Sequence, residues 1–394
     1  MTKEKILMIT STFPAFLGND SPVFVHELAK SIAQIDNFQI IILTPYRKNS
    51  RLYEKKDGLK IYRFKYGSTS LCDGAILSEL KKNKLLWLVV PFFFLAYVIK
   101  LKKIIRKEKI KIIHAHWIVP QCLVAVICKK IFCPKIKIIG TIHGSDITKI
   151  KNARLKKFIL NNLDSLTVVS NELKNEINKL NFKKQLEIET IPMGVDDKKF
   201  NPCNYQKWIK EKYNIENSFL LFVGRLSEEK GVKYLLRAMP KIIEKNNKLK
   251  LLIIGDGHLK TDLQKMTADL KISDNVLFLG KIPNNELPPY FATADIFIGP
   301  SEREGFGLVF VEALMSKTPV IASNLKSISD IINKETGISI NIKDTEKFSD
   351  AIIKLLSDEK LRRKFSEKGY EYAKNNFSLS EISKKYNQLL AELF

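Results

Sequence analysis

Residues 300–314 are Pro300-Ser-Glu-Arg-Glu-Gly-Phe-Gly-Leu-Val-Phe-Val-Glu-Ala-Leu314, and they follow an apolar run, residues 294–299, with the length of a buried strand. The stretch predicts a turn that carries Glu304 and two glycines, and then an apolar helix that carries Glu312. Backbone N–H groups at such a helix start attract phosphate. Carboxylates are poor phosphate ligands, but they accept hydrogen bonds from sugar hydroxyls. The stretch therefore predicts a nucleotide-sugar pocket, in which the two carboxylates bind ribose and hexose.

A second segment, residues 222–231, supplies cations for the same kind of pocket. Its sequence is Phe-Val-Gly-Arg-Leu-Ser-Glu-Glu-Lys-Gly, so Arg225 follows a strand and Lys230 precedes a predicted helix. An arginine can contact two phosphate oxygens at once, while a lysine supplies a point charge. Surface ion pairs with Glu228 or Glu229 are the alternative for both cations.

Length and composition indicate two basic domains. The chain has 394 residues, which exceeds the usual size of one core, and 45% of them are hydrophobic. The formal net charge of +24 suits a polyanionic partner or an anionic membrane. No zinc-finger spacing or aromatic RNA-binding motif accompanies the lysines, so we do not expect nucleic acid as a partner.

The cysteines and the start of the chain favour a reduced, cytoplasmic compartment. There are five cysteines, an odd number, and the pair Cys128 and Cys133 lacks a second close pair that would complete a metal site. The sequence begins Met-Thr-Lys-Glu-Lys and continues into a predicted strand at residues 6–10, without the apolar stretch of a secretory signal.

Residues 85–99 form an uncharged apolar segment that is short of the roughly 20 residues needed to span a bilayer. Lysines and an arginine bracket it within residues 81–111. This combination predicts a peripheral contact with an anionic membrane, at the inner face of the cell membrane. A buried core helix with solvated basic ends is the alternative.

Strand-like runs alternate with helical stretches throughout the chain, as in doubly wound α/β domains. The predicted strands are residues 5–10, 39–44, 110–114, 136–141 and 165–169 in the first half, and 219–223, 249–254, 275–279, 295–299 and 319–322 in the second. Ligands of such sheets bind beyond the carboxyl ends of the strands. Candidate residues at those ends are Gly18, His116, His143, Gly224, Gly255 and Glu304.

Three motifs together resemble the retaining glycosyltransferases called group 1 or family 4. They are Glu304-x7-Glu312, the Gly-Arg-Leu-x-x-x-Lys-Gly segment at residues 224–231, and His143-Gly-Ser-Asp146. The resemblance spans nearly the whole chain and implies the GT-B fold, in which two Rossmann-like doubly wound domains face an interdomain cleft. It implies an acceptor-side domain at residues 1–197, a nucleotide-sugar domain at 198–377, and a terminal helix at 378–394 that crosses back to the first domain.

The resemblance also implies roles for residues of the second domain. Arg225 and Lys230 would bind the donor diphosphate and stabilise the leaving group. Glu312 would accept both ribose hydroxyls, and Glu304 would bind hydroxyls of the transferred sugar. The remaining donor-binding residues are Gly224, the backbone N–H groups of Phe306, Gly307, Leu308 and Val309 at the distal phosphate, and backbone groups of Lys281 and Ile282 at the base.

In the first domain, the resemblance places His143 near the donor sugar. Asp146 would lie on the acceptor side, or it would cap the helix that follows. His116 is the second acceptor-side candidate, with a structural role as the alternative. Gly18 lies in a loop where the family has adjacent glycines near the diphosphate, and this chain has a single glycine there.

The resemblance implies transfer of a hexose or N-acetylhexosamine from a nucleotide-diphosphate sugar, with UDP favoured over GDP. Together with the positive charge, it implies a lipid-linked saccharide or other glycan of cell-surface polysaccharide biosynthesis as the acceptor. No Asp-x-Asp motif follows a strand, so neither a metal nor a cofactor is expected.

Hydrolysis by Glu304 and Glu312 ranks below transfer, because eight helical positions span about 12 Å and glycosidase carboxyls lie about 5 to 9 Å apart. An epimerase of the same fold and a non-catalytic binding subunit stay open. Nicotinamide-dependent oxidoreduction is discarded, since no Gly-x-Gly-x-x-Gly follows the first strand.

Overall fold

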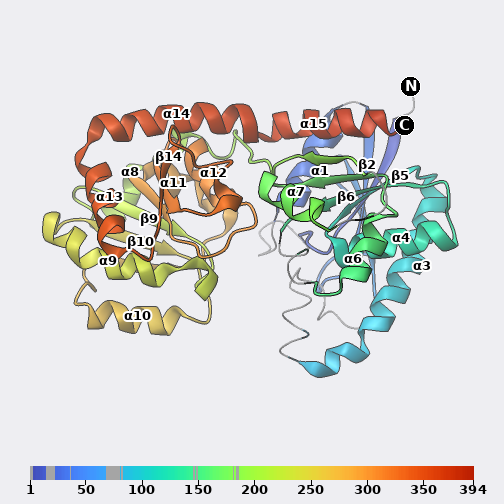
Figure 1. Ribbon diagram of the computed structural model, residues 1–394, viewed down its shortest axis with the longest axis horizontal. Coiled ribbons are helices and arrows are strands. Elements are labelled where there is room, and N and C mark those ends of the chain that lie inside the picture. The colour runs from blue at the N-terminus through green and yellow to red at the C-terminus, as the bar shows by residue number, and fades with distance from the viewer. Residues whose placement is uncertain are drawn as a thin grey trace. The chain divides into compact units, whose positions relative to one another are not determined.

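The computed structural model describes residues 3–14, 23–35, 37–67, 80, 83–144, 147, 150–180, 182 and 186–394. The chain forms two compact units (Figure 1). Unit 1 comprises Met1–Gly194 and Leu379–Phe394, and unit 2 comprises Val195–Ser378. The chain therefore leaves unit 1 once and returns to it through its last helix.

The sheet of unit 1 has the strand order β3-β4-β2-β1-β5-β6-β7-β8. Its strands are β1 (Glu4–Ile9), β2 (Phe38–Pro45), β3 (Tyr53–Lys56), β4 (Leu59–Phe64), β5 (Ile112–His116), β6 (Lys137–Ile142), β7 (Ser165–Val168) and β8 (Ile188–Thr190). They pair in parallel, except that β3 and β4 form an antiparallel hairpin. Asp57 and Gly58 at its tip have φ angles of 53° and 77°, which suits a tight hairpin turn.

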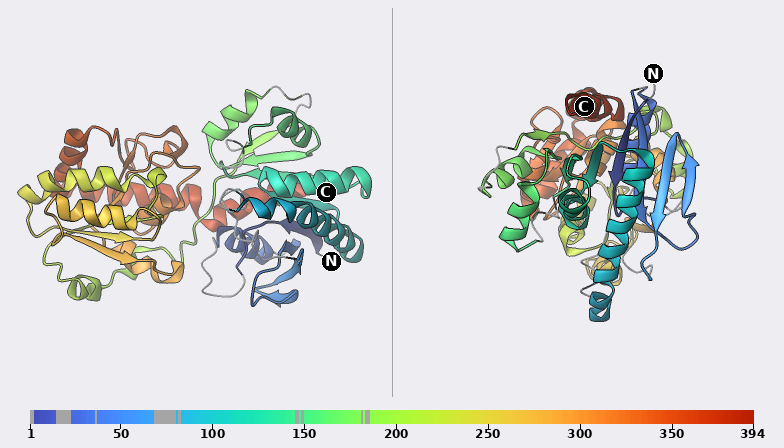
Figure 2. Two further views of the ribbon diagram at one scale, coloured as in Figure 1. Left: turned by 90° about the horizontal axis from the view of Figure 1, so that it is seen from below. Right: turned by 90° about the vertical axis from the view of Figure 1, so that its right-hand side faces the viewer.

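Helices pack on both faces of this sheet (Figure 2). On one face, α1 (Phe24–Gln34) and α15 (Leu379–Glu392) share a core with alternate side chains of the strands, including Ile6, Met8 and Ile40. On the other face, Tyr97 of α3 (Val90–Glu108) stacks on Phe64 of β4 with ring centroids 4.5 Å apart. The other helical segments described are η1 (Lys84–Leu88), η2 (Ile118–Cys122), α4 (Leu123–Ile131), α6 (Ala153–Leu160) and α7 (Asn171–Asn178).

The sheet of unit 2 is parallel, with the order β11-β10-β9-β12-β13-β14. Its strands are β9 (Phe219–Val223), β10 (Lys250–Ile254), β11 (Val276–Gly280), β12 (Ile296–Gly299), β13 (Val320–Ser323) and β14 (Gly337–Ile340). The helical segments are η3 (Pro202–Asn204), α8 (Lys207–Lys212), η4 (Glu228–Lys230), α9 (Val232–Lys245), α10 (Lys260–Asp269), η5 (Asn284–Glu286), α11 (Pro288–Thr293), α12 (Leu308–Met315), η6 (Lys326–Ile328), α13 (Thr345–Ser357) and α14 (Glu359–Phe377).

The apolar spacing of the sequence accounts for the core of unit 2. The buried residues of α9 recur every three or four positions, from Val232 through Leu235 and Met239 to Ile242, so one side of the helix packs into the core. The strand β9 is buried along its whole length, as expected for a central parallel strand between two helical layers.

Each sheet has a point where the strand order reverses. In unit 1 this point lies between β1 and β5, and in unit 2 it lies between β9 and β12. The loops that leave neighbouring strands at such a point turn to opposite faces and open a crevice at the carboxyl ends.

Candidate functional site

The two motifs of unit 2 meet where the strand order reverses. The loop after β9 carries Arg225 and Lys230, and the loop after the neighbouring strand β12 carries Glu304. Lys230 Nζ forms an ion pair with Glu304 Oε1, and Ser301 Oγ donates to the same oxygen at 3.0 Å. The ion pairs of Lys230 with Glu228 or Glu229, which were the alternative to a donor-binding role, do not form. A cation and a carboxylate from separate motifs thus lie in contact in one crevice.

Two glycines allow the loops of this crevice to approach each other closely. Gly231 has φ 62°, and a Cβ atom there would lie 1.9 Å from the carbonyl oxygen of Pro300. Gly255 has φ 144°, and a Cβ atom there would lie 1.8 Å from the carbonyl oxygen of Gly224. A larger residue at either position would force the loops apart.

A hydrogen-bonded clamp holds the same two loops together. Tyr234 OH donates to Glu302 Oε1 at 2.5 Å, and Lys233 Nζ lies 3.2 Å from that oxygen. The backbone N–H of Glu302 donates to the carbonyl oxygen of Glu229 at 2.8 Å. The hydrogen bond from Tyr234 lowers the pKa of Glu302, and it raises the pKa of Tyr234. The contact between Tyr234 and Glu302 was not predicted from the sequence. The feature that could have indicated it is a tyrosine on the first turn of a strongly amphipathic helix.

The helix α12 begins in the same crevice. Gly307 precedes it with φ 91°, and no side chain caps its first N–H groups among the described residues. These groups, at Leu308 and Val309, point out of the start of the helix, where a bound anion would be stabilised. Phe306 is buried and its ring packs against Phe377, so it can offer a ligand its backbone but not its side chain.

Glu312 is a buried carboxylate in an otherwise apolar helix. It is 8% exposed, and its neighbours in α12 are buried apolar residues. A charged group at such a position requires polar partners. Its burial beside the crevice agrees with a role in ligand binding, which stays a prediction.

The remaining donor-side candidates lie at the carboxyl edge of the same sheet. Arg225 is exposed and forms no ion pair with any described carboxylate. Lys281 is exposed and Ile282 is half-buried, and both directly follow β11, whose last residue Gly280 has φ 71°. The strand β10 separates β11 from β9, so these residues lie to one side of the Lys230–Glu304 pair.

Three histidines gather at the carboxyl edge of the sheet of unit 1. His114 and His116 both lie on β5, which runs two residues beyond its predicted end, and His143 follows β6. His116 Nδ1 lies 3.1 Å from His143 Nε2, and the two rings stack with centroids 5.4 Å apart. Trp117 and Phe24 pack against His143, at centroid distances of 4.7 and 5.2 Å.

The three histidines differ in their contacts and in their accessibility to a ligand. His114 Nε2 lies 2.7 Å from Thr141 Oγ1 and its ring packs on Tyr386 of α15, so its role is structural. His116 is completely buried beneath His143. This burial favours a positioning role for His116 over direct contact with an acceptor. His143 is the residue of the three that a ligand would meet first.

Burial keeps these imidazoles neutral. It lowers the pKa of His114 and of His143 to about 3, and it lowers the pKa of His116 well below its ordinary value. The buried atoms His114 Nδ1, His116 Nε2 and His143 Nδ1 have no hydrogen-bond partner among the described residues. Two further candidates, Gly18 and Asp146, lie outside the described residues.

The part of the chain that the structure describes contains no cluster of three or more histidine, cysteine or acidic side chains suited to a metal ion. Within the same residues, no helix is both long and apolar enough to cross a bilayer.

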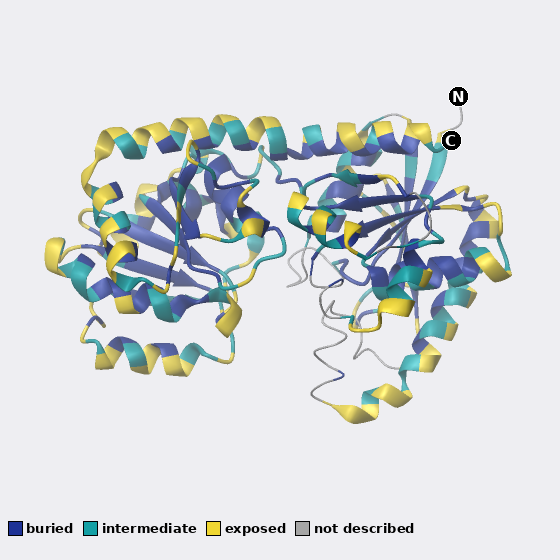
Figure 3. Ribbon diagram, in the orientation of Figure 1, coloured by how far each residue is buried: buried dark blue, intermediate teal, exposed yellow. Residues whose placement is uncertain are grey.

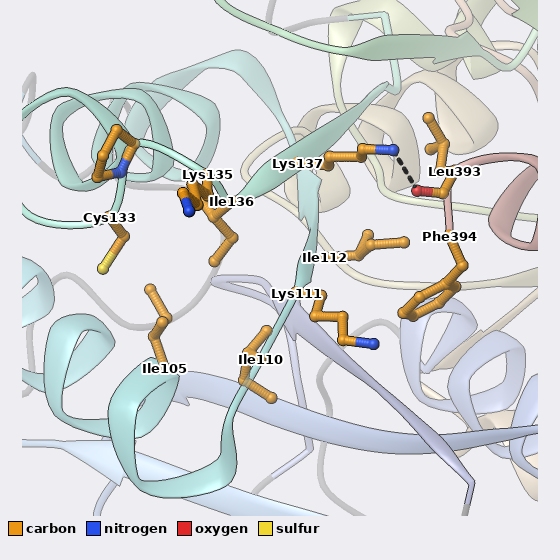
Figure 4. A pocket seen from close by; sticks show the side chains of 11 residues that line it. Ile105, Ile110, Lys111, Ile112, Cys133, Lys135, Ile136, Lys137, Leu393 and Phe394 are labelled. Carbon is orange, nitrogen blue, oxygen red and sulfur yellow. Dashed lines mark hydrogen bonds between the residues drawn. The ribbon is translucent and has the colours of Figure 1, made fainter.

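A cavity of about 610 Å³ lies in unit 1 at the amino ends of β5 and β6, away from the carboxyl edge of that sheet (Figure 4). Isoleucines form its wall, with Lys111, Lys135 and Lys137 around them. Lys137 Nζ donates to the carbonyl oxygen of Leu393 at 2.7 Å, and Phe394 borders the opening. Parallel sheets bind substrates at their carboxyl ends, so this cavity is not our candidate active site.

Two family models match the chain. The model described as glycosyl transferases group 1 matches residues 206–372, and the model described as glycosyltransferase family 4 matches residues 22–199. The chain is 30% identical to the N-acetyl-alpha-D-glucosaminyl L-malate synthase of Bacillus anthracis over 76% of this chain and 79% of that protein. It is also 30% identical to the UDP-Gal:alpha-D-GlcNAc-diphosphoundecaprenol alpha-1,3-galactosyltransferase of Escherichia coli, over 67% and 71% of the two chains.

A solved structure has the same fold along the whole chain. The sucrose-phosphate synthase of Thermosynechococcus elongatus superposes with a TM-score of 0.82 at 22% identity, covering 100% of this chain and 99% of that one. Together with the two parallel sheets, this likeness confirms the predicted fold class, GT-B with two Rossmann-like units.

Proposed function

The chain belongs to the group 1 family of glycosyltransferases, and on that premise we propose that it transfers a hexose or N-acetylhexosamine from a UDP-sugar to a lipid-linked saccharide, with retention of anomeric configuration. The product would be a precursor of a cell-surface polysaccharide. The observation that carries the proposal is the contact between Lys230 and Glu304 beside the start of α12.

The Lys230–Glu304 pair suggests how a donor would be bound. Cleavage of the bond between the anomeric carbon and the phosphate oxygen leaves negative charge on the departing diphosphate. Lys230 would exchange Glu304 for a phosphate oxygen, and Arg225 would bind further oxygens of the diphosphate. The exchange would free the carboxylate of Glu304 to accept hydrogen bonds from the sugar hydroxyls. The N–H groups at the start of α12 would bind the distal phosphate, and Glu312 the ribose.

Retention places the acceptor on the side of the sugar from which the diphosphate leaves. In unit 1, His143 is the candidate that would border the sugar, with His116 holding its ring in place. An epimerase would instead need an acid and a base around the sugar ring, and the low pKa values of these buried histidines disfavour that role.

The acceptor is proposed from the relatives and from the charge of the chain. The galactosyltransferase of Escherichia coli is named for a diphosphoundecaprenol-linked acceptor, and the synthase of Bacillus anthracis for L-malate. The net charge of +24 and the apolar segment at residues 85–99 favour an acceptor presented at an anionic membrane. We therefore place the enzyme in the cytoplasm, at the inner face of the cell membrane.

A nucleotide panel tests the donor. The purified protein is heated with UDP, GDP, ADP or TDP and with their sugar conjugates, with and without a chelator. We expect UDP and one UDP-sugar to raise the melting temperature, because a ligand that binds the folded state stabilises it by mass action. A rise in melting temperature with GDP alone would exclude UDP as the donor nucleotide. If the chelator abolishes the rise, the protein needs a metal ion to bind the nucleotide. If no nucleotide raises the melting temperature, the non-catalytic binding subunit is favoured.

A transfer assay then tests the acceptor and the stereochemistry. The selected donor is offered with undecaprenyl-diphosphate N-acetylglucosamine and, separately, with L-malate, and the anomeric configuration of the product is read by NMR. Transfer to the lipid-linked sugar with the donor's configuration supports the proposal. Transfer to malate alone, or an inverted product, would contradict it.

A further inference from the structure

The segment formed by η1 and α3 presents a row of large apolar side chains to solvent. Each is more than half exposed: Leu85, Trp87, Leu88, Phe92, Leu95 and Ile99. Within α3, the exposed positions 92, 95 and 99 are three and four residues apart and so share one side of the helix. Figure 3 shows this exposed surface along the lower part of α3. We call these six residues the apolar row.

The opposite side of α3 packs on the sheet and fixes the direction of the helix. Glu108, at its end, accepts from Tyr62 OH at 2.6 Å and lies 3.5 Å from Lys5 Nζ, close to the start of β1. Phe93, near its beginning, packs against Tyr66, which lies beyond the end of β4, with centroids 5.0 Å apart. The helix therefore runs antiparallel to the strands.

It follows that the segment before Phe93 extends past the carboxyl edge of the sheet of unit 1. This segment includes η1 and the apolar residues from Leu85 to Phe92. In Figure 1 the corresponding end of α3 reaches beyond the strands of its own unit. The same edge carries His116 and His143. Among the described residues of unit 1, the strongly exposed Leu85, Leu88 and Phe92 thus lie toward the same edge of the sheet as the candidate acceptor site.

Positive charges accompany the apolar row. Lys84 precedes it and is exposed, and Lys103 and Arg106 continue the same side of α3. None of these three forms an ion pair with a described carboxylate. Cations next to an exposed apolar side are attracted to anionic lipids, so they add to the affinity of the apolar side chains for such a surface.

We propose that the apolar row inserts into the headgroup boundary of an anionic bilayer and holds the carboxyl edge of the sheet of unit 1 against it. The inference deepens the proposed function, on which it rests for the lipid-linked acceptor. The row is too short to span a bilayer, and its length suits a helix lying at the surface. An acceptor headgroup held at this bilayer would face the edge of the sheet that carries His143.

A vesicle assay with a matched control tests the insertion. The full chain is sedimented with vesicles of phosphatidylcholine, with or without phosphatidylglycerol. The test variant carries Leu88→Glu and Phe92→Glu. The control is Ile131→Glu at the end of α4, because Ile131 is 64% exposed and Phe92 is 65% exposed, while α4 ends near the amino edge of the sheet. We expect the test variant to lose at least about 30-fold in affinity for the anionic vesicles, and the control to bind as the wild type does.

A second measurement guards against a folding defect in the charged variant. Vesicles with brominated acyl chains should quench the tryptophan fluorescence of the wild type, and Trp87→Phe should remove most of that quenching while the protein stays bound. Equal binding of test and control variants, no binding of the wild type, or a dimer that only the test variant abolishes would each overturn the proposal.

The two proposals fail in different ways. If the insertion is wrong but the proposed function is right, the test variant binds vesicles normally and the enzyme still transfers sugar to the lipid-linked acceptor. If the proposed function is wrong, no nucleotide raises the melting temperature, whereas wild-type vesicle binding and its loss in the test variant are unaffected.

Discussion

Lys230 and Glu304 lie on separate loops of unit 2, and their side chains form an ion pair. Each lies on a loop after a parallel strand, and their contact joins positions 74 residues apart. The pair is partly buried, with side-chain exposures of 24% and 9%, so its charges are less screened than those of a surface pair. Tyr234 and Glu302 brace the same loops from outside the pair.

Lys230→Ala should therefore reduce turnover strongly while changing stability little. Loss of a cation aimed at a leaving group costs about 100-fold or more in kcat, whereas a partly exposed ion pair contributes about 1 kcal/mol or less to stability. Lys241→Ala is the matched control, because Lys241 lies on α9 and pairs with Glu346 at 2.6 Å at the surface. Steady-state kinetics measure the turnover of both variants, and thermal melts measure their stability. Unchanged turnover in Lys230→Ala would show that Lys230 does not bind the donor diphosphate.

The buried histidines of unit 1 predict a pH dependence of stability. Burial lowers the pKa of His114 and of His143 to about 3, while an unfolded histidine titrates near 6.5. The unfolded state thus binds more protons below pH 6.5, so this stability is complete above pH 6.5 and is lost progressively as the pH falls toward 3. Between pH 7.5 and 5, each of these two histidines should lower the free energy of unfolding by about 2 kcal/mol.

Urea unfolding at several pH values measures this slope. His114→Gln should reduce the slope by about one proton, whatever its effect on stability at neutral pH. The wild type, unfolded in urea at the same pH values, is the reference for this slope. An unchanged slope in His114→Gln would show that His114 is not held neutral by burial.

At the scale of the elements, the crevice of unit 2 depends on how closely two loops approach. The left-handed backbone of Gly231 lets η4 end against the loop after β12 and lets α9 begin at Val232. The loop after β9 and the loop after β10 approach similarly, at Gly224 and Gly255. The relative positions of Lys230 and Glu304 are therefore set by backbone contacts, not only by their own ion pair.

Gly231→Ala should separate the two loops and impair the reaction. Its added methyl group would meet the carbonyl oxygen of Pro300, and we expect a fall of at least about 10-fold in kcat/KM from misplaced groups. Gly58→Ala is the control, because Gly58 also has a positive φ of 77° but no atom within 4 Å of the added methyl. Both variants should lose about 1 to 2 kcal/mol of stability from backbone strain, and only Gly231→Ala should lose activity. Equal activities would contradict the proposed loop geometry.

At the scale of the whole molecule, the C-terminal helix belongs to the core of unit 1. Ile382, Tyr386, Leu389 and Leu390 of α15 are buried with strand residues of that unit. Burial of four such side chains contributes about 6 to 12 kcal/mol, which is comparable to the net stability of a domain. Unit 2, by contrast, is one continuous segment with its own core.

The two units should therefore differ when they are isolated. Residues 195–378 should fold alone and keep the response to UDP, since the candidate donor residues lie within them. Residues 1–194 should fail to fold until residues 379–394 are restored, because one face of their sheet is otherwise exposed. Circular dichroism melts of the three fragments test this, and a stable fold of residues 1–194 alone would show that α15 is dispensable.

The fold class and most of the strands follow from the amino-acid pattern alone. Alternation of short apolar runs with amphipathic stretches is a local property, so it indicates parallel sheets before any contact is known. The strand over residues 219–223 was predicted with its observed ends. The motifs around Lys230, Glu304 and His143 likewise named their candidates, whose roles in binding and catalysis stay predictions.

Which residues contact each other, and which are exposed to solvent, depends on the folding of the whole chain. The contact between Tyr234 and Glu302 joins positions 68 residues apart, the hairpin of β3 and β4 was not predicted, and His116 proved to be buried beneath His143. In the sequence, the apolar residues 85–99 predicted a peripheral membrane contact, with a buried core helix as the alternative. In the structure, packing buries one side of α3 and leaves the other exposed. The physical reason is that secondary structure follows from neighbours along the chain, whereas burial and pairing follow from strand order and packing, which bring distant residues together.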